Sequence, residues 1–497
     1  MNSTFVQVGI ALAQAVALLM SVAFITYVVI IVVPFSRHRP SRPGHAGSLD
    51  WHFFVPALNE DQVIGGTIGY LRDTFPMAHV WVIDDASDDH TGAIVSHHAA
   101  LDPMVHVVSR RFPDARTGKG HALNAAYRQL SHWLPRGADR RLVIIGVVDA
   151  DGRPAANCLD VIAGADLFGD PVVGSVQIQV RMMNRDDPRP FPQRGRLVNS
   201  LGQALVRLQD LEFRVPISAI QCARRFTKSV GLGGNGQFSR VSALDVLADT
   251  NGEPWRGALL EDYELCLHLM MTGHRNEYTP DTYVDQEALP DIRRLVRQRT
   301  RWGQGTMQCG VYLRQLWTSP HVGTLAALEA TYYLLQPWLQ LVGTLVYPVP
   351  AAVFVANYLA GPTAMQTWMA SGGWMIVIFY LLIGLGPFVL WGPLYRSQCE
   401  GRISVLRSIG LGFGYALFVC IFYITSWRAF SRILRHREDW FKTRRNAEFI
   451  SEIELGAPPS PIELGASLFP AQPGAPSSPR AVQLVTVMNG ETNDWQS

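Results

Sequence analysis

The chain has 497 residues, of which 48% are hydrophobic and only 17% are charged. Soluble domains usually carry about 25% charged residues, so this composition argues against a wholly soluble protein and favours a membrane-associated one. The formal net charge of +2 gives no sign of a nucleic-acid partner, and none is expected. Six cysteines without metal or disulfide spacing favour a reduced, cytoplasmic body.

An apolar run opens the chain. Residues 5–35 carry no charged side chain, and the run is longer than the ~20 residues that cross a bilayer. A cleaved signal peptide is the alternative, but no basic segment precedes the run, and its length exceeds the usual apolar region of about 7–15 residues. We therefore predict a transmembrane anchor over residues 1–36.

Three more apolar stretches lie toward the other end, at residues 325–360, 374–395 and 405–427. They predict a transmembrane region over residues 325–428. Basic clusters follow the first apolar run of the chain and the last, and such clusters favour the cytoplasmic side of a membrane. Three crossings after a cytoplasmic body would place the second cluster outside, which conflicts with this tendency.

Three resolutions of the conflict remain open. The first stretch turns back as a hairpin at residues 347–350, or one stretch lies in the membrane interface, or the charge tendency fails here. The sequence predicts three to five spans in total. The expected location is the cell (inner or plasma) membrane, with a multi-pass chain and a cytoplasmic catalytic domain.

Between the two membrane regions, residues 48–310 alternate between strand-like and helix-like patterns. Runs rich in Val, Ile and aromatic residues predict buried strands at residues 52–55, 79–83, 105–108, 142–148 and 172–180. Helical patterns such as residues 122–133 fall between several of them. The alternation predicts an α/β domain with a mainly parallel sheet and binding residues at the carboxyl ends of its strands.

Polar motifs stand at these strand ends. Pro56, Asn59 and Glu60 follow the first predicted strand, and Asp85 follows the second within the run D-D-A-S-D-D. Acidic groups there offer acceptors to an imide N–H and to ribose hydroxyls, which suits a uridine nucleotide, although a turn and helix cap would explain either motif alone. Lys119, in G-K-G-H-A-L-N at a predicted helix start, is a candidate for a phosphate or base contact.

The fourth predicted strand runs directly into Asp149-Ala150-Asp151. Strand alternation would aim both carboxylates to one side. Two hard oxygen ligands, completed by a diphosphate and water, suit Mg²⁺ or Mn²⁺. A simple turn would explain an isolated D-x-D, so the prediction of a metal site depends on the ordered motifs around it.

An acidic pair and a Q-x-x-R-W pentad precede the second membrane region. The residues are Glu261 and Asp262, followed by Gln298, Arg299, Arg301 and Trp302. The carboxylates can activate an acceptor hydroxyl, the guanidinium groups can hold a diphosphate, and the indole can stack on a sugar ring. Taken alone, the pentad is equally typical of a basic amphipathic helix on lipid headgroups.

This ordered set resembles the family 2 glycosyltransferases, which include cellulose, chitin and hyaluronan synthases and many lipid glucosyltransferases. The resemblance covers about residues 53–302 and implies a GT-A nucleotide-diphospho-sugar transferase domain, here with transmembrane helices on both sides. It implies that Asp85 contacts uracil, that Asp149 and Asp151 hold the diphosphate and metal, and that Asp262 is the catalytic base, with Glu261 supporting it.

Other segments agree with the resemblance or depart from it. Residues 233–238 match a Gly-rich acceptor-side segment, and residues 176–181 match the strand before it. Leu260 stands where many synthases have Thr, and Ala86 stands where Gly is common. Neither departure changes a charged group, so they bear on the substrate more than on the reaction.

The resemblance implies a metal-dependent, inverting hexosyltransferase that uses a UDP-sugar. Residues 208–213, 233–240 and 297–308 are similar to bacterial diacylglycerol β-glucosyltransferases, which favours transfer of one sugar, expected to be glucose, to a membrane lipid. The alternative is a processive β-polysaccharide synthase that extends a growing glycan. A membrane-anchored nucleotide-sugar sensor or inactive scaffold is disfavoured, because all the acidic motifs are complete.

After residue 445 the chain becomes rich in Pro, Ser and Gly, and I-E-L-G-A occurs twice, nine residues apart. Two copies are too few for a solenoid, which needs about three or more. We predict a disordered tail over residues 446–497.

Overall fold

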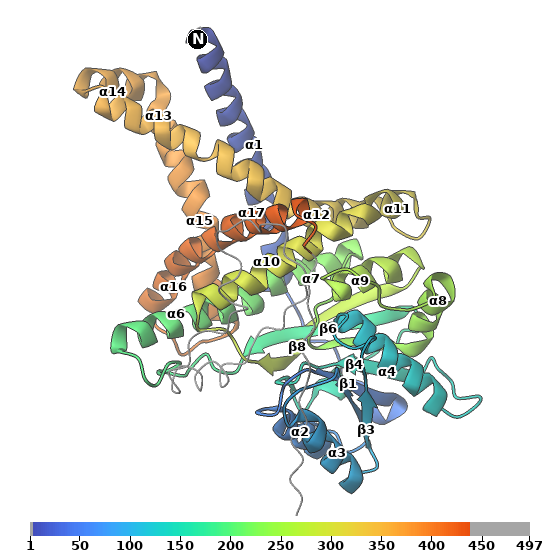
Figure 1. Cartoon of the computed structure of the whole chain (residues 1–497). Coiled ribbons are helices and arrows are strands. Elements are labelled where there is room, and N and C mark those ends of the chain that lie inside the picture. The colour runs from blue at the N-terminus through green and yellow to red at the C-terminus, as the bar shows by residue number, and fades with distance from the viewer. Residues whose placement is uncertain (1–2, 438–497) are drawn as a thin grey trace, which may run out of the picture. The chain divides into compact units, whose positions relative to one another are not determined.

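A mixed eight-stranded sheet forms the centre of the body in the computed structural model, which describes residues 3–437 (Figure 1). The strand order is β3-β2-β1-β4-β7-β6-β8-β5. Strands β1 to β4 are parallel where they pair, whereas β7 runs antiparallel to both β4 and β6. The strands are β1 (Asp50–Ala57), β2 (His79–Asp84), β3 (Val105–Ser109), β4 (Val143–Val147), β5 (Arg153–Pro154), β6 (Val173–Met182), β7 (Gln237–Arg240) and β8 (Arg275–Gln286).

All five predicted strands are present, as β1, β2, β3, β4 and β6. The expectation of a mainly parallel sheet is only half right, because β5, β7 and β8 were not predicted and all three take part in antiparallel pairs. Strand β7 has four residues with no apolar alternation, and β8 carries charged and amide side chains along its length. Both lack the hydrophobic pattern on which strand prediction depends.

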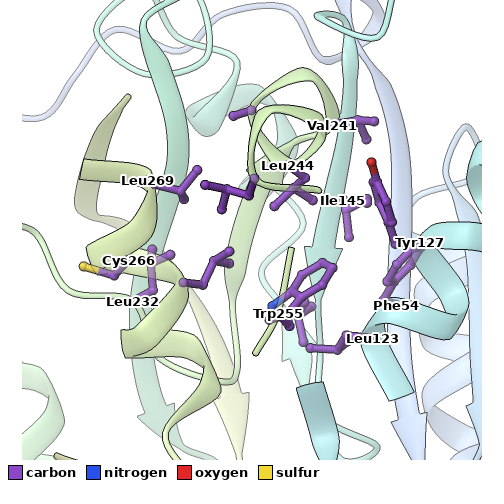
Figure 2. Close-up of a cluster of buried hydrophobic side chains, with 14 of the residues drawn as sticks. Phe54, Leu123, Tyr127, Ile145, Leu232, Val241, Leu244, Trp255, Cys266 and Leu269 are labelled. Atoms are coloured by element: carbon purple, nitrogen blue, oxygen red, sulfur yellow. The ribbon is translucent and has the colours of Figure 1, made fainter. Parts of the chain in front are cut away.

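Helices cover both faces of the sheet and build two hydrophobic cores. On one face, α4 (Lys119–Trp133) and α8 (Val241–Asn251) pack on β1 and β4, and α9 (Glu261–Met271) packs on β6 and β8. Figure 2 shows part of this core, in which Leu123 of α4 and Leu244 of α8 lie near Trp255 and Tyr127 of α4 lies near Phe54. The other face carries α2 (Ile64–Thr74), α3 (Thr91–Leu101) and α5 (Cys158–Ile162).

The remaining helices of the body lie between the sheet and the apolar helices (Figure 1). They are α6 (Arg196–Glu212), the π-helical turn Phe213–Ile217, α7 (Ser218–Thr227), α10 (Ile292–Gln308) and α11 (Leu313–Thr318). The first core continues beyond the body, because Ala326, Ala330 and Leu334 of α12 belong to it. The body and α12 therefore share one hydrophobic core.

Four helical segments are long and apolar enough to cross a membrane: Phe5–Ser36, Thr324–Leu359, Pro362–Gln398 and Val405–Leu434. They indicate a membrane protein. The segments comprise α1 (Ser3–Ser36), α12 (Thr324–Val346) with α13 (Pro348–Leu359), α14 (Pro362–Trp368) with α15 (Trp374–Gln398), and α16 (Val405–Phe418) with α17 (Cys420–Leu434). The tail predicted over residues 446–497 lies outside the described residues.

The hairpin alternative for residues 347–350 is wrong. Tyr347 keeps helical dihedral angles (φ −66°, ψ −30°) between α12 and α13, so the chain kinks there without reversing. Pro348 and Pro350 stand in the first turn of α13, where a missing N–H costs little.

Helices α16 and α17 lie beside the body. Helix α17 runs along α10 (Figure 1), where Ala429 packs near Gly303 and the side chain of Arg432 donates a 2.7 Å hydrogen bond to Gln304. Helix α16 packs closely on α15, because a Cβ built on Gly412 would lie 2.2 Å from the carbonyl oxygen of Val389. The last apolar segment is thus fixed by contacts to the helix that carries the pentad.

A buried ion pair joins the body to the apolar helices. Arg224 of α7 donates from Nε to Glu329 of α12 at 2.9 Å, and the Tyr27 hydroxyl of α1 donates to the same carboxylate oxygen at 2.7 Å. The Arg224 guanidinium also lies 4.8 Å from the ring centroid of Tyr333. The two ionic side chains are only 5% and 14% exposed, so removing either charge leaves the other buried without compensation.

We predict that Glu329→Ala destabilises the protein by roughly 3–5 kcal/mol, because the buried Arg224 charge loses its partner. Thermal unfolding in detergent measures the effect as a lower Tm. Asp139→Ala is the matched control, since its pair with Arg141 is on the surface and should leave Tm unchanged. Equal Tm values for Glu329→Ala and the control would show that the ion pair does not hold α12 to the body.

Candidate active site

The predicted site residues gather at the carboxyl ends of β1, β2 and β4, around a cavity of about 1510 Å³. Eleven of them line it: Pro56, Glu60, Asp85, Lys119, Asp149, Glu261, Asp262, Gln298, Arg299, Arg301 and Trp302. Asn59 and Asp151 do not line it. Segments separated by more than 200 residues in sequence thus meet in one space.

Asp85 lies in a pocket at the end of β2. It is 5% exposed, and one of its carboxylate oxygens accepts hydrogen bonds from the side chain of Arg110 and from the backbone N–H of Arg116 at 3.0 Å. Asn59 stabilises the adjoining loop, because its side-chain oxygen accepts the N–H of Asp88 at 2.8 Å. The loop is fixed while Asp85 lines the cavity.

Ala86 follows Asp85 with a φ of +61°, and Asn59 has a φ of +54°. Left-handed conformations of this kind cost little for Gly and more for Ala. This explains physically why Gly is common at the position of Ala86. The substitution keeps the turn, and the hydrogen bond of 3.0 Å from Asp85 N to Ala57 O holds it against β1.

The D-x-D motif lies in a turn beyond β4, not in the strand as expected. Strand alternation therefore does not orient its side chains, and tertiary contacts do. Asp149 lines the cavity with 35% of its side chain exposed, whereas Asp151 is buried and accepts the backbone N–H of Glu287 at 3.0 Å. The N–H of Asp149 is held by the side-chain oxygen of Asn235 at 3.2 Å.

The donor set suits a hard divalent cation only in part. Two carboxylates stand two residues apart in one turn, and oxygen ligands are what Mg²⁺ and Mn²⁺ prefer. Among residues 3–437 no group of three or more His, Cys, Asp and Glu side chains is arranged to hold a metal ion. The protein can thus supply two ligands, and a diphosphate and water would have to supply the others.

Lys119, in the first turn of α4, bridges the two halves of the site. Its ammonium donates to Asp149 at 2.7 Å and to the carbonyl oxygen of Gly234 at 2.8 Å, and it lies 4.0 Å from Glu261. Burial lowers the pKa of Lys119, but the neighbouring carboxylates raise it further, so the net shift is upward and the side chain stays charged. The ammonium is the positive centre of an acidic cavity.

Glu261 and Asp262 begin α9, and Asp262 faces the cavity. Asp262 is 8% exposed, and its Oδ1 accepts the N–H of Tyr263 at 2.6 Å. The pKa of Asp262 is raised to about 7, first by burial and then by the charge of Glu261, while Lys119 opposes both effects. A carboxylate with this pKa is suited to accept a proton near neutral pH.

Gly234 permits this close approach. A Cβ built on it would lie 2.9 Å from the Lys119 ammonium and 3.3 Å from Oδ2 of Asp262. Any side chain there would occupy the space between the Asp262 carboxylate and the Lys119 ammonium. The Gly-rich segment therefore contributes space as well as the carbonyl that Lys119 binds.

Arg299 and Arg301 of the pentad have different surroundings. Arg299 is 4% exposed, pairs with the buried Glu212, and lies 4.1 Å from the ring centroid of Trp302. Its charge is thus compensated inside the protein. Arg301 lines the cavity, and its positive charge offsets part of the effect of burial, which raises the pKa of Glu261.

Helix α10 also positions the segment before the acidic pair, through the side chain of Gln308 and the close contact at Gly305. Gln308 accepts the N–H of Leu259 at 3.0 Å, and a Cβ built on Gly305 would lie 2.6 Å from the Cβ of Leu260. The segment that leads into α9 therefore lies directly on α10.

Several residues of the site were missed as site residues. Gln177 of β6 donates to the carbonyl of Asn235 at 2.9 Å and accepts the N–H of Gly233 at 2.8 Å, which fixes the Gly-rich segment. Gln286 accepts from Asn235 at 2.9 Å. The sequence held one indication of this role, the amide of Gln177 inside an otherwise largely apolar strand, because a buried polar side chain needs a hydrogen-bond partner.

The cavity continues from the acidic pair into the apolar helices. Beyond Trp302 its walls carry polar and aromatic side chains of α1, α12 and α17, among them Tyr27, Gln336, Gln340 and Tyr423. A molecule held among these helices could reach Asp262 without leaving the cavity.

Known proteins similar to this chain include a beta-monoglucosyldiacylglycerol synthase from Synechocystis sp., with 28% identity over 348 residues. That match covers 69% of this chain and 61% of the relative, so the chain spans less than two thirds of the relative's length. An undecaprenyl-phosphate mannosyltransferase from Micrococcus luteus is 38% identical over 125 residues, which are 25% of this chain and 47% of that protein.

Among solved structures, a mannosyltransferase from Pyrobaculum calidifontis in complex with GDP-Man and Mn²⁺ superposes with a TM-score of 0.49 and 19% identity. The superposition covers 82% of this chain and 99% of that one. Residues 50–305, over half of the chain, match the family described as "Glycosyltransferase like family 2". The chain therefore belongs to this glycosyltransferase family, as its ordered motifs indicated, and its body has the GT-A-like fold of a mixed sheet covered by helices.

Proposed function

We propose that the protein transfers one sugar, glucose, from a UDP-sugar to a membrane lipid acceptor such as diacylglycerol, with inversion to a β-linkage. The observation that carries this proposal is the position of Asp262, in a cavity that joins the strand ends to the apolar helices. A donor bound at Asp85, Lys119 and Asp149 and a lipid held among the helices would meet at its carboxylate.

Asp262 is the proposed general base. Its carboxylate accepts the proton of the acceptor hydroxyl while that oxygen attacks the anomeric carbon on the face opposite the diphosphate. The C–O bond to the diphosphate breaks in the same step, so an α-linked donor gives a β-linked product. General-base help of this kind is typically worth about 10²–10⁴-fold in rate. Glu261 supports the base by keeping its pKa raised.

The leaving diphosphate needs compensation of its developing negative charge. Lys119 and Arg301 are the proposed cationic partners, because both line the cavity next to the acidic pair, while Arg299 is already paired with Glu212. When bound at Asp149 and Asp151, Mg²⁺ or Mn²⁺ supplies further positive charge to the diphosphate. Arg299 then has a supporting role, holding Trp302 and anchoring α10 to α6.

The acceptor is proposed to enter from the membrane, because polar groups follow the cavity into the apolar helices. The similarity to a beta-monoglucosyldiacylglycerol synthase supports a lipid acceptor. A processive β-polysaccharide synthase is the second candidate, and the several tyrosine and glutamine side chains along the cavity favour it, since such groups bind sugar rings and hydroxyls.

A three-span topology accounts for the charge distribution. We propose that residues 1–36 anchor the chain, that residues 48–310 form the cytoplasmic catalytic domain, and that residues 325–428 form the second membrane region. In this region α12–α13 and α14–α15 cross, while α16–α17 lies in the interface against α10. The basic residues around Arg428 then stay on the cytoplasmic side, as the positive-inside tendency expects.

Membranes that contain the protein are expected to convert labelled UDP-glucose into a low-mass, chloroform-soluble product. Asp262→Asn should lower turnover by at least about 10²-fold while UDP binding, measured by calorimetry, is retained. Asp245→Asn is the control, because Asp245 pairs with Arg140 away from the cavity. An insoluble polymer would favour the synthase, and substantial turnover by Asp262→Asn would remove Asp262 from the role of base.

The pH dependence of kcat/KM should show an acidic limb. The base acts only when unprotonated, so activity should fall as pH decreases through about 7, the pKa of Asp262. Because the charge of Glu261 raises this pKa, Glu261→Gln should move the limb to lower pH. A pH profile of both proteins measures the displacement, and an unmoved limb would contradict the assignment.

Chelation by EDTA should abolish transfer, and added Mg²⁺ or Mn²⁺ should restore it. Since the protein supplies two carboxylates, Mn²⁺ measured by electron paramagnetic resonance should bind more tightly with UDP present than alone, and Asp151→Asn should weaken that binding at least about tenfold. The exposed Asp166 provides the control variant Asp166→Asn. Full activity after chelation would count against the metal site.

A further inference from the structure

The outer half of α6 exposes apolar side chains that no described element covers. Leu197, Val198 and Leu201 are 74%, 43% and 63% exposed. On the same helix, Leu205 and Leu208 continue the spacing of Leu197 and Leu201, and these two pack against the core formed with α15 and α16. The stripe is thus covered where it meets the apolar helices and uncovered beyond them.

Helix α16 lies next to the covered part of this stripe. A Cβ built on Gly414 would lie 3.4 Å from Leu208. Helix α16 itself exposes Leu406, Phe413 and Leu417, which are 80%, 50% and 75% exposed and belong to a segment apolar enough for a membrane. The exposed stripe of α6 therefore continues from a surface that is itself suited to lipid.

Three arginines accompany the exposed stripe. Arg189, Arg194 and Arg196 are exposed, and within residues 3–437 none of them forms an ion pair. The nearby Asp186 pairs with Arg207 at 2.9 Å, while Asp187 accepts the N–H of Arg189 at 2.8 Å. The side-chain charge at this edge of the body is therefore positive.

The arginine-bearing loop is held firmly on the helix. Buried Asn199 accepts the N–H of Phe191 at 2.9 Å and donates to the carbonyl of Arg194 at 2.8 Å. A Cβ built on Gly202 would lie 3.0 Å from both Phe191 and Pro190, so the loop packs closely on α6. Charged and apolar groups thus keep a fixed arrangement.

We propose that the first turns of α6, with Arg189, Arg194 and Arg196, form a docking surface for anionic phospholipid headgroups. The guanidinium groups bind phosphate oxygens, while Leu197, Val198 and Leu201 enter the headgroup–acyl boundary. The surface is separate from the acceptor cavity, because none of these six residues lines it. The positive charge favours anionic lipid over a second copy of the same surface, which would bring like charges together.

Docking would act on the active site through the helix itself. The far end of α6 carries Glu212, the partner of Arg299 in α10. A lipid contact at the first turns of α6 would therefore set the distance of the body from the membrane surface. The last residue of the same helix, Glu212, contacts the helix that carries the pentad.

The test uses the full-length protein in phosphatidylcholine vesicles with and without phosphatidylglycerol. A nitroxide attached at Leu197→Cys, in a background with the exposed Cys420 replaced by alanine, reports access to a water-soluble relaxation agent. We expect the label at 197 to be protected when phosphatidylglycerol is present and several-fold less protected without it. Leu101→Cys on α3 is the matched control, since Leu101 is 72% exposed and should stay accessible in both vesicles.

A separate variant tests the contribution of the three arginines. Arg189→Gln/Arg194→Gln/Arg196→Gln should abolish the phosphatidylglycerol-dependent protection of the label at 197 and keep the wild-type Tm in detergent, which shows that the variant is folded. Arg128→Gln/Arg136→Gln/Arg141→Gln, at exposed arginines of the opposite side, should keep that protection. Equal access at 197 and 101, protection that does not depend on phosphatidylglycerol, or label–label broadening from a second copy would each overturn the proposal. None of these readouts requires turnover, so they stand apart from the proposed reaction.

Discussion

One ammonium group, that of Lys119, lies among the carboxylates of Asp149, Glu261 and Asp262, and the site depends on this balance of charge. Three acids in a buried space would repel one another and become protonated. The lysine reduces this cost enough to leave one carboxylate, Asp262, with a pKa near neutrality.

Three segments place these charged groups. Asp149 lies in the turn after β4 and Lys119 in the first turn of α4. Gly234 supplies a carbonyl oxygen to Lys119 and leaves space between the charges.

The attachment of the body to the apolar helices has a similar logic. Arg224, Glu329 and Tyr27 come from three helices and satisfy one another in a nearly dry position. Such a pair adds little net stability compared with apolar packing, but it fixes which groups face each other. The first hydrophobic core also includes residues of α12. The body and the membrane region, which both line the cavity, are therefore packed against each other.

The pentad combines two roles within one helical turn. Arg299 forms an ion pair with Glu212 and lies over the ring of Trp302, so it connects α10 to α6. Arg301, two residues later, lines the same cavity, and its charge acts on Glu261. Both arginines thus line the cavity, but Arg299 is already paired with Glu212, and this arrangement serves single transfers and repeated ones equally.

The α/β body, five of its strands, the apolar regions and the ordered motifs of the family could all be predicted from the sequence. This was possible because buried strands and membrane helices have strong local patterns, and because acidic groups at strand ends fall at the same edge of a parallel sheet. The sequence could not identify β7 and β8, because their polar side chains find hydrogen-bond partners only in residues distant in the chain.

Three features could be known only from the three-dimensional structure. The backbone of Glu287 orients Asp151, and Glu212 pairs with Arg299. Residues 347–350 form a kink. The same structure also places α17 along α10. Each of these outcomes depends on a contact between residues far apart in sequence, and neither propensity nor spacing carries that information.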